Sequence, residues 1–213
     1  MVSVFRFSSV VAFAFSLLTA ASAWAQTAQP VGEVVAQRGA ATAMRNGQPV
    51  SLSSGSSVFV NDQIFTYKGS GVKLKFTDGS EVSVGEEGLL QVDRFAHDRP
   101  TNTRNALFTF VRGIFRATVA SLAPASSWDV RTETAVASVR STDWMLAARA
   151  DLAEVFVHEG SVAVRNIKHP LTPGEVMLFP GDGTDVRPDA RPTGPVRWGP
   201  PRINNFNART TVP

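Results

Sequence analysis

Hydrophobic residues recur at every second position in several short segments between residues 31 and 181. In residues 72–76, three apolar side chains alternate with two lysines, and residues 81–84, 154–157 and 161–164 show the same alternation. Successive side chains of a strand point to opposite faces of a sheet, so this period predicts β-strands. No segment keeps a 3.6-residue period over three turns, and the sequence therefore predicts an all-β body.

Short turns containing glycine separate these predicted strands. Asp78-Gly79 follows one alternating segment, Glu159-Gly160 follows another, and each is followed by serine and a Val-x-Val sequence. Residues 74–80 and 155–161 therefore form a weak internal repeat in which each copy predicts a turn between two strands. The pattern is compatible with strands coiled as a short β-solenoid or stacked as a sandwich, and both alternatives stay open.

Residues 1–25 have the composition of a secretory signal peptide. One charge, Arg6, precedes an apolar run, and Ala23 and Ala25 supply the small residues that signal peptidase requires before Gln26. We expect cleavage after Ala25 and a periplasmic or secreted location. The alternative is an uncleaved anchor, but the unbroken apolar run is about half of the ~20 residues that span a bilayer, and no later run is long enough either.

The segment 182–213 differs in composition from the body. It contains six of the 13 prolines and five arginines against three aspartates, whereas residues 26–181 balance 15 basic with 15 acidic residues. A neutral body gives no electrostatic reason to bind nucleic acid. The prolines predict an extended docking arm, in which Trp198 and Phe206 are apolar anchors and the arginines, Arg197 among them, face an acidic partner. The alternative is a disordered end.

The sequence offers few candidates for catalysis or for cofactor binding. Cysteine is absent, and the three histidines, His97, His158 and His169, are not spaced as metal ligands. There is neither a Gly-x-Ser-x-Gly motif nor a glycine-rich phosphate loop. We expect no metal, no cofactor and no enzymatic activity. The alternative is an envelope glycan hydrolase that uses the turn carboxylates Asp78, Glu86 and Glu87.

Residues 139–144 are the strongest local candidate for a contact surface. Arg140, Asp143 and Trp144 combine opposite charges with an aromatic ring, which is a composition common among interface anchors. In the alternative, which we favour, Trp144 packs into the core while Arg140 and Asp143 neutralise each other at a corner.

The order of these motifs resembles the FecR domain, a periplasmic β domain known from regulators of iron uptake. Its most recognisable stretch is matched by Val72-x-Leu74-x-Phe76-x-Asp78-Gly79-Ser80-x-Val82, in which Asp78, Gly79 and Ser80 form the family-motif turn. Further similar segments lie, in the family's order, at residues 31–39, 52–66, 110–116, 132–142 and 154–164. The resemblance covers roughly residues 31–180 and implies a single FecR-like domain over residues 26–181.

The sequence departs from the family pattern at several positions. Asn61 and Ser141 replace glycine, and Glu133 replaces proline. Asparagine tolerates a positive φ, whereas Ser141 is expected to alter its corner. Sigma-regulating members carry a cytosolic head and a membrane helix before the domain, where this sequence has a predicted signal peptide.

These features together imply a stand-alone exported module for envelope sensing or signalling. We expect it to contact a protein partner or an envelope polymer, which is not identified by the sequence. A further alternative is a purely structural protein whose strand edges pair to form oligomers.

Overall fold

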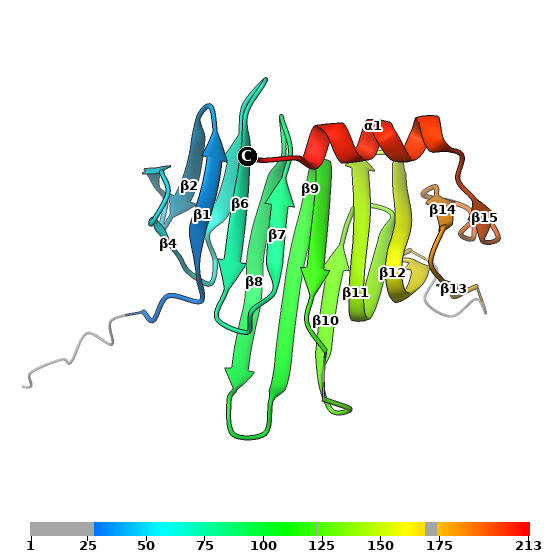
Figure 1. The fold of residues 1–213 in the computed structure, drawn as a ribbon, viewed down its shortest axis with the longest axis horizontal. Helices are drawn as coiled ribbons and strands as arrows, with labels where there is room; N and C mark the ends of the chain where they lie inside the picture. The colour runs from blue at the N-terminus through cyan, green and yellow to red at the C-terminus, as the bar shows by residue number, and fades with distance from the viewer. Residues whose placement is uncertain (1–27, 122, 169–173) are drawn as a thin grey trace, which may run out of the picture.

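The computed structural model describes residues 28–121, 123–168 and 174–213, and it consists of strands with one helix (Figure 1). The strands are β1 (Gly32–Arg38), β2 (Ala41–Arg45), β3 (Gln48–Leu52), β4 (Ser57–Val58), β5 (Gln63–Thr66), β6 (Gly71–Phe76), β7 (Glu81–Val84), β8 (Leu89–Asp98), β9 (Thr103–Val119), β10 (Ser127–Arg131), β11 (Ala135–Arg149), β12 (Leu152–Asn166), β13 (Val176–Leu178), β14 (Asp182–Val186) and β15 (Val196–Arg197). The helix α1 is Pro200–Thr210. The predicted all-β class is confirmed. The predicted signal peptide at 1–25 lies outside the described residues.

All of these strands belong to one hydrogen-bonded sheet, and its three longest strands bend. The first half of β9 pairs with β8 and β10, and its second half pairs with β7 and β11. The change of partner occurs at Gly113, where φ is 101°. The strands β11 and β12 change partners in the same way at Ser141 (φ 48°) and Gly160 (φ 81°).

The bends divide the sheet into two layers. We call β1, β6, β7, β14 and the adjoining halves of β9, β11 and β12 the front layer, and β2, β3, β5, β8, β10, β13 and the other halves the back layer (Figure 1). Apolar side chains from both layers form one core. The rings of Phe76 and Phe108, from opposite layers, lie 5.2 Å apart, and those of Trp128 and Trp144 lie 6.4 Å apart.

The strand directions favour the sandwich over the solenoid. Every strand pair among the described residues is antiparallel except β9 with β10. A coil of stacked turns would pair its strands in parallel. Asp78-Gly79 forms the predicted turn between β6 and β7, but Glu159-Gly160 lies inside β12 at its bend, so the turn predicted for the second repeat is wrong. Glycine serves both places because each needs a positive φ.

The prediction of an extended tail is wrong for much of residues 182–213. The strand β14 joins the sheet beside β12, and α1 crosses the outer face of the front layer (Figure 1). Proline at the first helical positions loses no hydrogen bond, and Ile203, Phe206 and Thr210 then share one face of three turns. Trp198 and Phe206 pack with Phe156 in a second apolar cluster. The expected domain boundary after residue 181 stays a prediction.

No helix within the described ranges is both long and apolar enough to cross a membrane.

Candidate binding surface

Buried polar side chains stabilise the family-motif turn. The Asp78 carboxylate accepts hydrogen bonds from the Ser80 amide and hydroxyl, each at 2.8 Å, while Gly79 adopts a φ of 84°. Arg104 from β9 lies 3.4 Å from the Asp78 carboxylate and donates to the Asp78 carbonyl oxygen at 3.1 Å. All of these side chains are buried. The turn therefore orients β6 and β7, and the side chains of Asp78 and Ser80 are not available to a ligand.

The three predicted contact residues of β11 do not form one surface. Trp144 is fully buried and packs edge-on against Phe115 at 5.2 Å. Asp143 forms a two-pronged pair with Arg116, at 2.9 and 2.6 Å, and not with Arg140. Arg140 is exposed, on the outer face of the back layer. Of the three, Arg140 is the one that remains open to a partner.

The three turn carboxylates have different surroundings. Asp78 is buried at the turn before β7, whereas Glu86 lies at the turn after β7 and accepts a hydrogen bond from the Gly69 amide at 3.0 Å. Glu87 lines a separate shallow pocket beside Lys68 that neither of the other two lines. Because Asp78 is buried, it is not available as one of the accessible paired carboxylates that a glycosidase requires.

The edge of the sheet at β13 exposes apolar side chains. Met177 is 44% exposed and Phe179 is 54% exposed, and with Glu175 they occupy alternate positions on one face of the chain. Met177, Glu175 and Arg140 also line a cavity of about 490 Å³ on the outer face of β10 to β13. The floor of this cavity consists of small residues, namely Ser127, Ser138, Ser161 and Ala163.

The apolar edge continues onto β15. Phe179 donates its amide to the Asp182 carboxylate, whose other oxygen lies 3.4 Å from Arg197 Nε. Val196, next to Arg197, is 51% exposed and pairs with Gly183. We call Arg140, Glu175, Met177, Phe179, Val196 and Arg197 the edge surface.

Trp198 does not belong to this surface, contrary to its prediction as an exposed contact. Its ring is 7% exposed, stacks on Phe156 at 5.1 Å and carries the Arg202 guanidinium 3.6 Å above it. Arg202 also bridges Glu154 and Asp185. Trp198 thus fixes the start of α1 to the sheet, while its neighbour Arg197 points outward at the edge.

A titratable group lies beneath α1. His158 of β12 packs edge-on against Phe156 at 4.9 Å, next to Arg116, Asp143 and Asn207. Burial and the nearby Arg116 charge lower the pKa of His158 below 6.5, and Asp143 and Asn207 oppose that shift more weakly. The neutral imidazole is therefore the form that this position favours.

Comparison with protein families gives a match over residues 62–163 to the family described as FecR protein. The chain contains a FecR domain. The match falls within the 31–180 range that the motifs indicate, and it includes the family-motif turn and the three bends of the FecR domain. The comparison with curated proteins found no significant match.

Solved structures share the fold of this FecR domain. Two crystal structures of a "putative anti-sigma factor" from Parabacteroides distasonis ATCC 8503 superimpose with a TM-score of 0.55 at 17% identity. Each alignment covers 68% of this chain. This chain spans 64% of the length of the chain in the first of these structures and 63% of that in the second. The similarity therefore concerns the fold of the aligned part only.

The edge surface largely lies outside the segment matched to the FecR family. Five of its six residues follow residue 163, and none of its apolar members was predicted from the sequence. Residues 176–179, Val-Met-Leu-Phe, are all apolar and show no alternation that would tell an exposed face from a buried one. The observation that reveals the surface is their position at the end of the sheet.

Proposed function

We propose that this FecR-domain chain is an exported, non-enzymatic binding module of an envelope signalling system, and that it holds a protein partner at the edge surface. The observation that carries the proposal is the clustering of exposed apolar side chains. Among the described residues, five large hydrophobic side chains are exposed, and three of them, Met177, Phe179 and Val196, belong to this edge.

The composition of the edge surface favours a protein over a polymer. Methionine, aromatic residues and arginine are enriched in protein interfaces, where the apolar side chains are desolvated at the centre. Arg140 lines the cavity that Met177 also lines. Arg197 lies beside Asp182, whose carboxylate accepts a hydrogen bond from the Phe179 amide. A partner with apolar residues flanked by acidic ones would complement this arrangement.

The signalling role and the exported location have separate support. The match to the FecR family and the likeness in fold to a protein described as an anti-sigma factor support a role in signalling. The composition of residues 1–25 supports export. N-terminal sequencing of the chain isolated from the envelope should begin at Gln26, and a chain that begins at Met1 would contradict cleavage.

Site-specific photocrosslinking in the native cell tests the partner site. A photoreactive phenylalanine analogue placed at Phe179 should capture one defined protein, and the serine substitution of Met177 should abolish that product. The analogue at Tyr67 is the matched control, since Tyr67 is 52% exposed but lies far along the chain, after β5. Capture of the same protein from both positions, capture of glycan alone, or no product at 179 would overturn the proposal. Capture of a second copy of the chain would favour a structural oligomer instead.

A further inference from the structure

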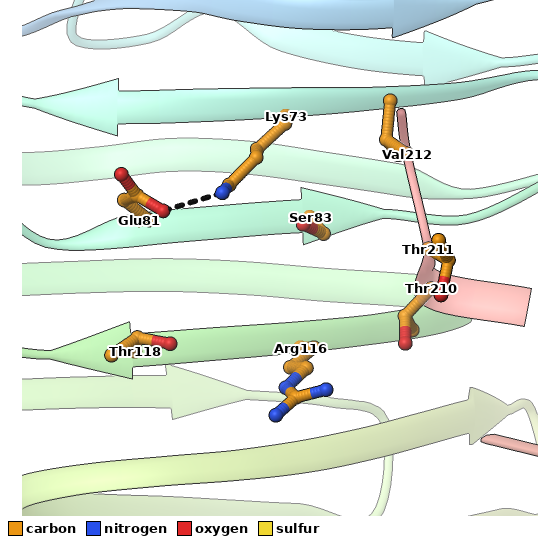
Figure 2. Close-up of a pocket in the computed structure, with 8 residues that line it drawn as sticks. All are labelled: Lys73, Glu81, Ser83, Arg116, Thr118, Thr210, Thr211 and Val212. Carbon is orange, nitrogen blue, oxygen red and sulfur yellow. Dashed lines mark ion pairs between the residues drawn. The ribbon is translucent and has the colours of Figure 1, made fainter. Parts of the chain in front are cut away.

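A polar pocket of about 280 Å³ opens on the outer face of the front layer, where α1 ends. Its lining consists of Lys73, Glu81, Ser83, Arg116, Thr118, Thr210, Thr211 and Val212. Figure 2 shows Thr210, Thr211 and Val212 on one side of the pocket, Glu81 and Thr118 on the other, and Ser83 between them. None of the residues of the edge surface lines this pocket.

The register of the strands explains the shape of this pocket. Ser83 pairs with Lys73 on one side and with Arg116 on the other, so a small hydroxyl residue lies between two long cationic ones. Glu81 pairs with Thr118 in the next outward-facing row. The floor is low at Ser83 because both neighbouring side chains extend above it.

The end of the chain forms a fixed wall of the pocket. Arg38 donates a hydrogen bond to the Thr211 carbonyl oxygen at 2.9 Å, and Thr211 donates its amide to Asn207 at 3.1 Å. Val212 packs over Gly71, where an added Cβ would lie 3.1 Å from the valine methyl group. This close approach uses the lack of a side chain at Gly71. The wall is thus held to the sheet at Arg38 and Gly71, and to α1 at Asn207, before any ligand binds.

The charges that line the pocket are already neutralised. Lys73 lies 2.6 Å from Glu81, and Arg116 lies 2.6 Å from Asp143. An ionic ligand would therefore lose its hydration without gaining an unpaired counter-charge. A neutral ligand with several hydroxyl groups meets a better match, because its hydroxyls both donate and accept. The lining offers the ammonium and guanidinium donors, the carboxylate acceptors and the hydroxyls of Ser83 and Thr118.

From this chemistry we propose that the pocket binds a neutral sugar residue of a glycan. Its volume lies just below the range of drug-sized pockets, which suits a single sugar ring. Val212, which also lines the pocket, supplies a small apolar contact for one face of the ring. The inference does not depend on the protein partner at the edge surface, and each can fail without the other.

Amide NMR of the full chain tests the proposal with defined probes. The methyl glycosides of glucose, mannose and N-acetylglucosamine are the neutral probes, and glucuronate, glucosamine and inorganic phosphate are the charged ones. We expect at least one neutral glycoside to shift the amides of Ser83, Thr118 and Thr211 with a millimolar Kd. The Ser83→Val variant loses one hydrogen bond and should weaken that Kd about fivefold.

Ser51→Val is the matched control, because Ser51 is exposed on β3 of the back layer and lines neither this pocket nor the cavity beside the edge surface. It should leave the Kd unchanged, and Thr118→Val provides a second variant should Ser83→Val fold poorly. Binding of glucuronate or phosphate alone would overturn the neutral class of ligand. Shifts confined to other parts of the protein, or no shift with any neutral glycoside at tens of millimolar, would overturn the site.

Discussion

Gly160 lies directly against the carbonyl oxygen of Ser141, at the point where β12 and β11 bend together from the front layer to the back layer. A Cβ atom on Gly160 would overlap that oxygen, and both residues have a positive φ, 81° for Gly160 and 48° for Ser141. The contact allows two neighbouring long strands to bend at the same level. The pairing on both sides of the bend is what joins the two layers into one sheet.

The Gly160→Ala substitution should destabilise the protein strongly. An alanine at this position would be strained by the left-handed backbone conformation, and its Cβ atom would also displace the Ser141 backbone. We therefore expect the free energy of unfolding to fall by about 3 kcal/mol or more. Gly47→Ala separates the two effects, because Gly47 has a φ of 76° with open space around it. That control should lose only about 1–2 kcal/mol. If urea denaturation gave the same loss of unfolding free energy for both variants, the contact between Gly160 and the Ser141 carbonyl oxygen would contribute nothing to stability.

Ser141→Gly should stabilise the protein. A serine held at positive φ costs about 1 kcal/mol, and glycine removes that cost at the expense of a more flexible unfolded chain. The net gain expected in the free energy of unfolding is up to about 1 kcal/mol. Ser161→Gly, in the extended part of β12, should instead lose about 0.5–1 kcal/mol. A destabilised Ser141→Gly variant would show that the serine side chain, and not its φ, matters at the bend.

Arg104→Met should be among the most damaging single substitutions in the domain. It leaves the Asp78 carboxylate buried without its cation, and breaking a buried pair costs about 3–5 kcal/mol. Glu81→Gln is the matched control, since Glu81 and Lys73 form a half-exposed pair whose loss should cost less than about 1 kcal/mol. Thermal unfolding of both variants checks the difference. Similar midpoints would mean that the pair does not anchor the family-motif turn.

The sequence predicted the strands and the family well, because both depend on local patterns. Alternating residues such as 72–76 become strands wherever one face is buried, and the Asp78-Gly79-Ser80 turn needs its own residues to form. The bends were missed for a physical reason. Glycine at a positive φ makes a turn at Gly79 but a bend at Gly160, and the difference depends on strands that pair far along the chain.

The binding surfaces were predicted less well, because exposure depends on the position of a strand in the sheet. Arg197 and Trp198 are adjacent in the sequence, and both were candidate contacts for a partner. In the structure Trp198 is buried under α1, whereas Arg197 is exposed at the edge of the sheet. Arg116 lies in the family-like segment 110–116, but the sequence indicated neither its pairing with Asp143 nor its position in the polar pocket. Its partner comes from a strand that is adjacent in space and 27 residues away.

His158 should make the stability of the domain depend on pH. Its pKa is lowered in the folded state, by burial first and by the Arg116 charge second, so the unfolded chain binds the proton more readily. The stability contributed by the neutral imidazole is therefore present above pH 6.5 and is lost as the pH falls from 6.5 through the lower pKa of the folded state. Urea denaturation across this interval should show a free energy of unfolding that rises with pH.

The variant His158→Gln tests this assignment, because glutamine keeps a polar side chain beside Asn207 but does not titrate. It should flatten the part of the pH slope that lies near neutrality, whereas His97→Gln, which leaves His158 in place, should preserve it. Because His158 lies beneath α1, the same titration should loosen the helix before the rest of the sheet unfolds. The protection factors of the Phe206 and Asn207 amides, which compare their exchange with the intrinsic rate at each pH, should then fall at low pH in the native chain and not in His158→Gln. A slope that survives in His158→Gln would assign the pH dependence to other groups.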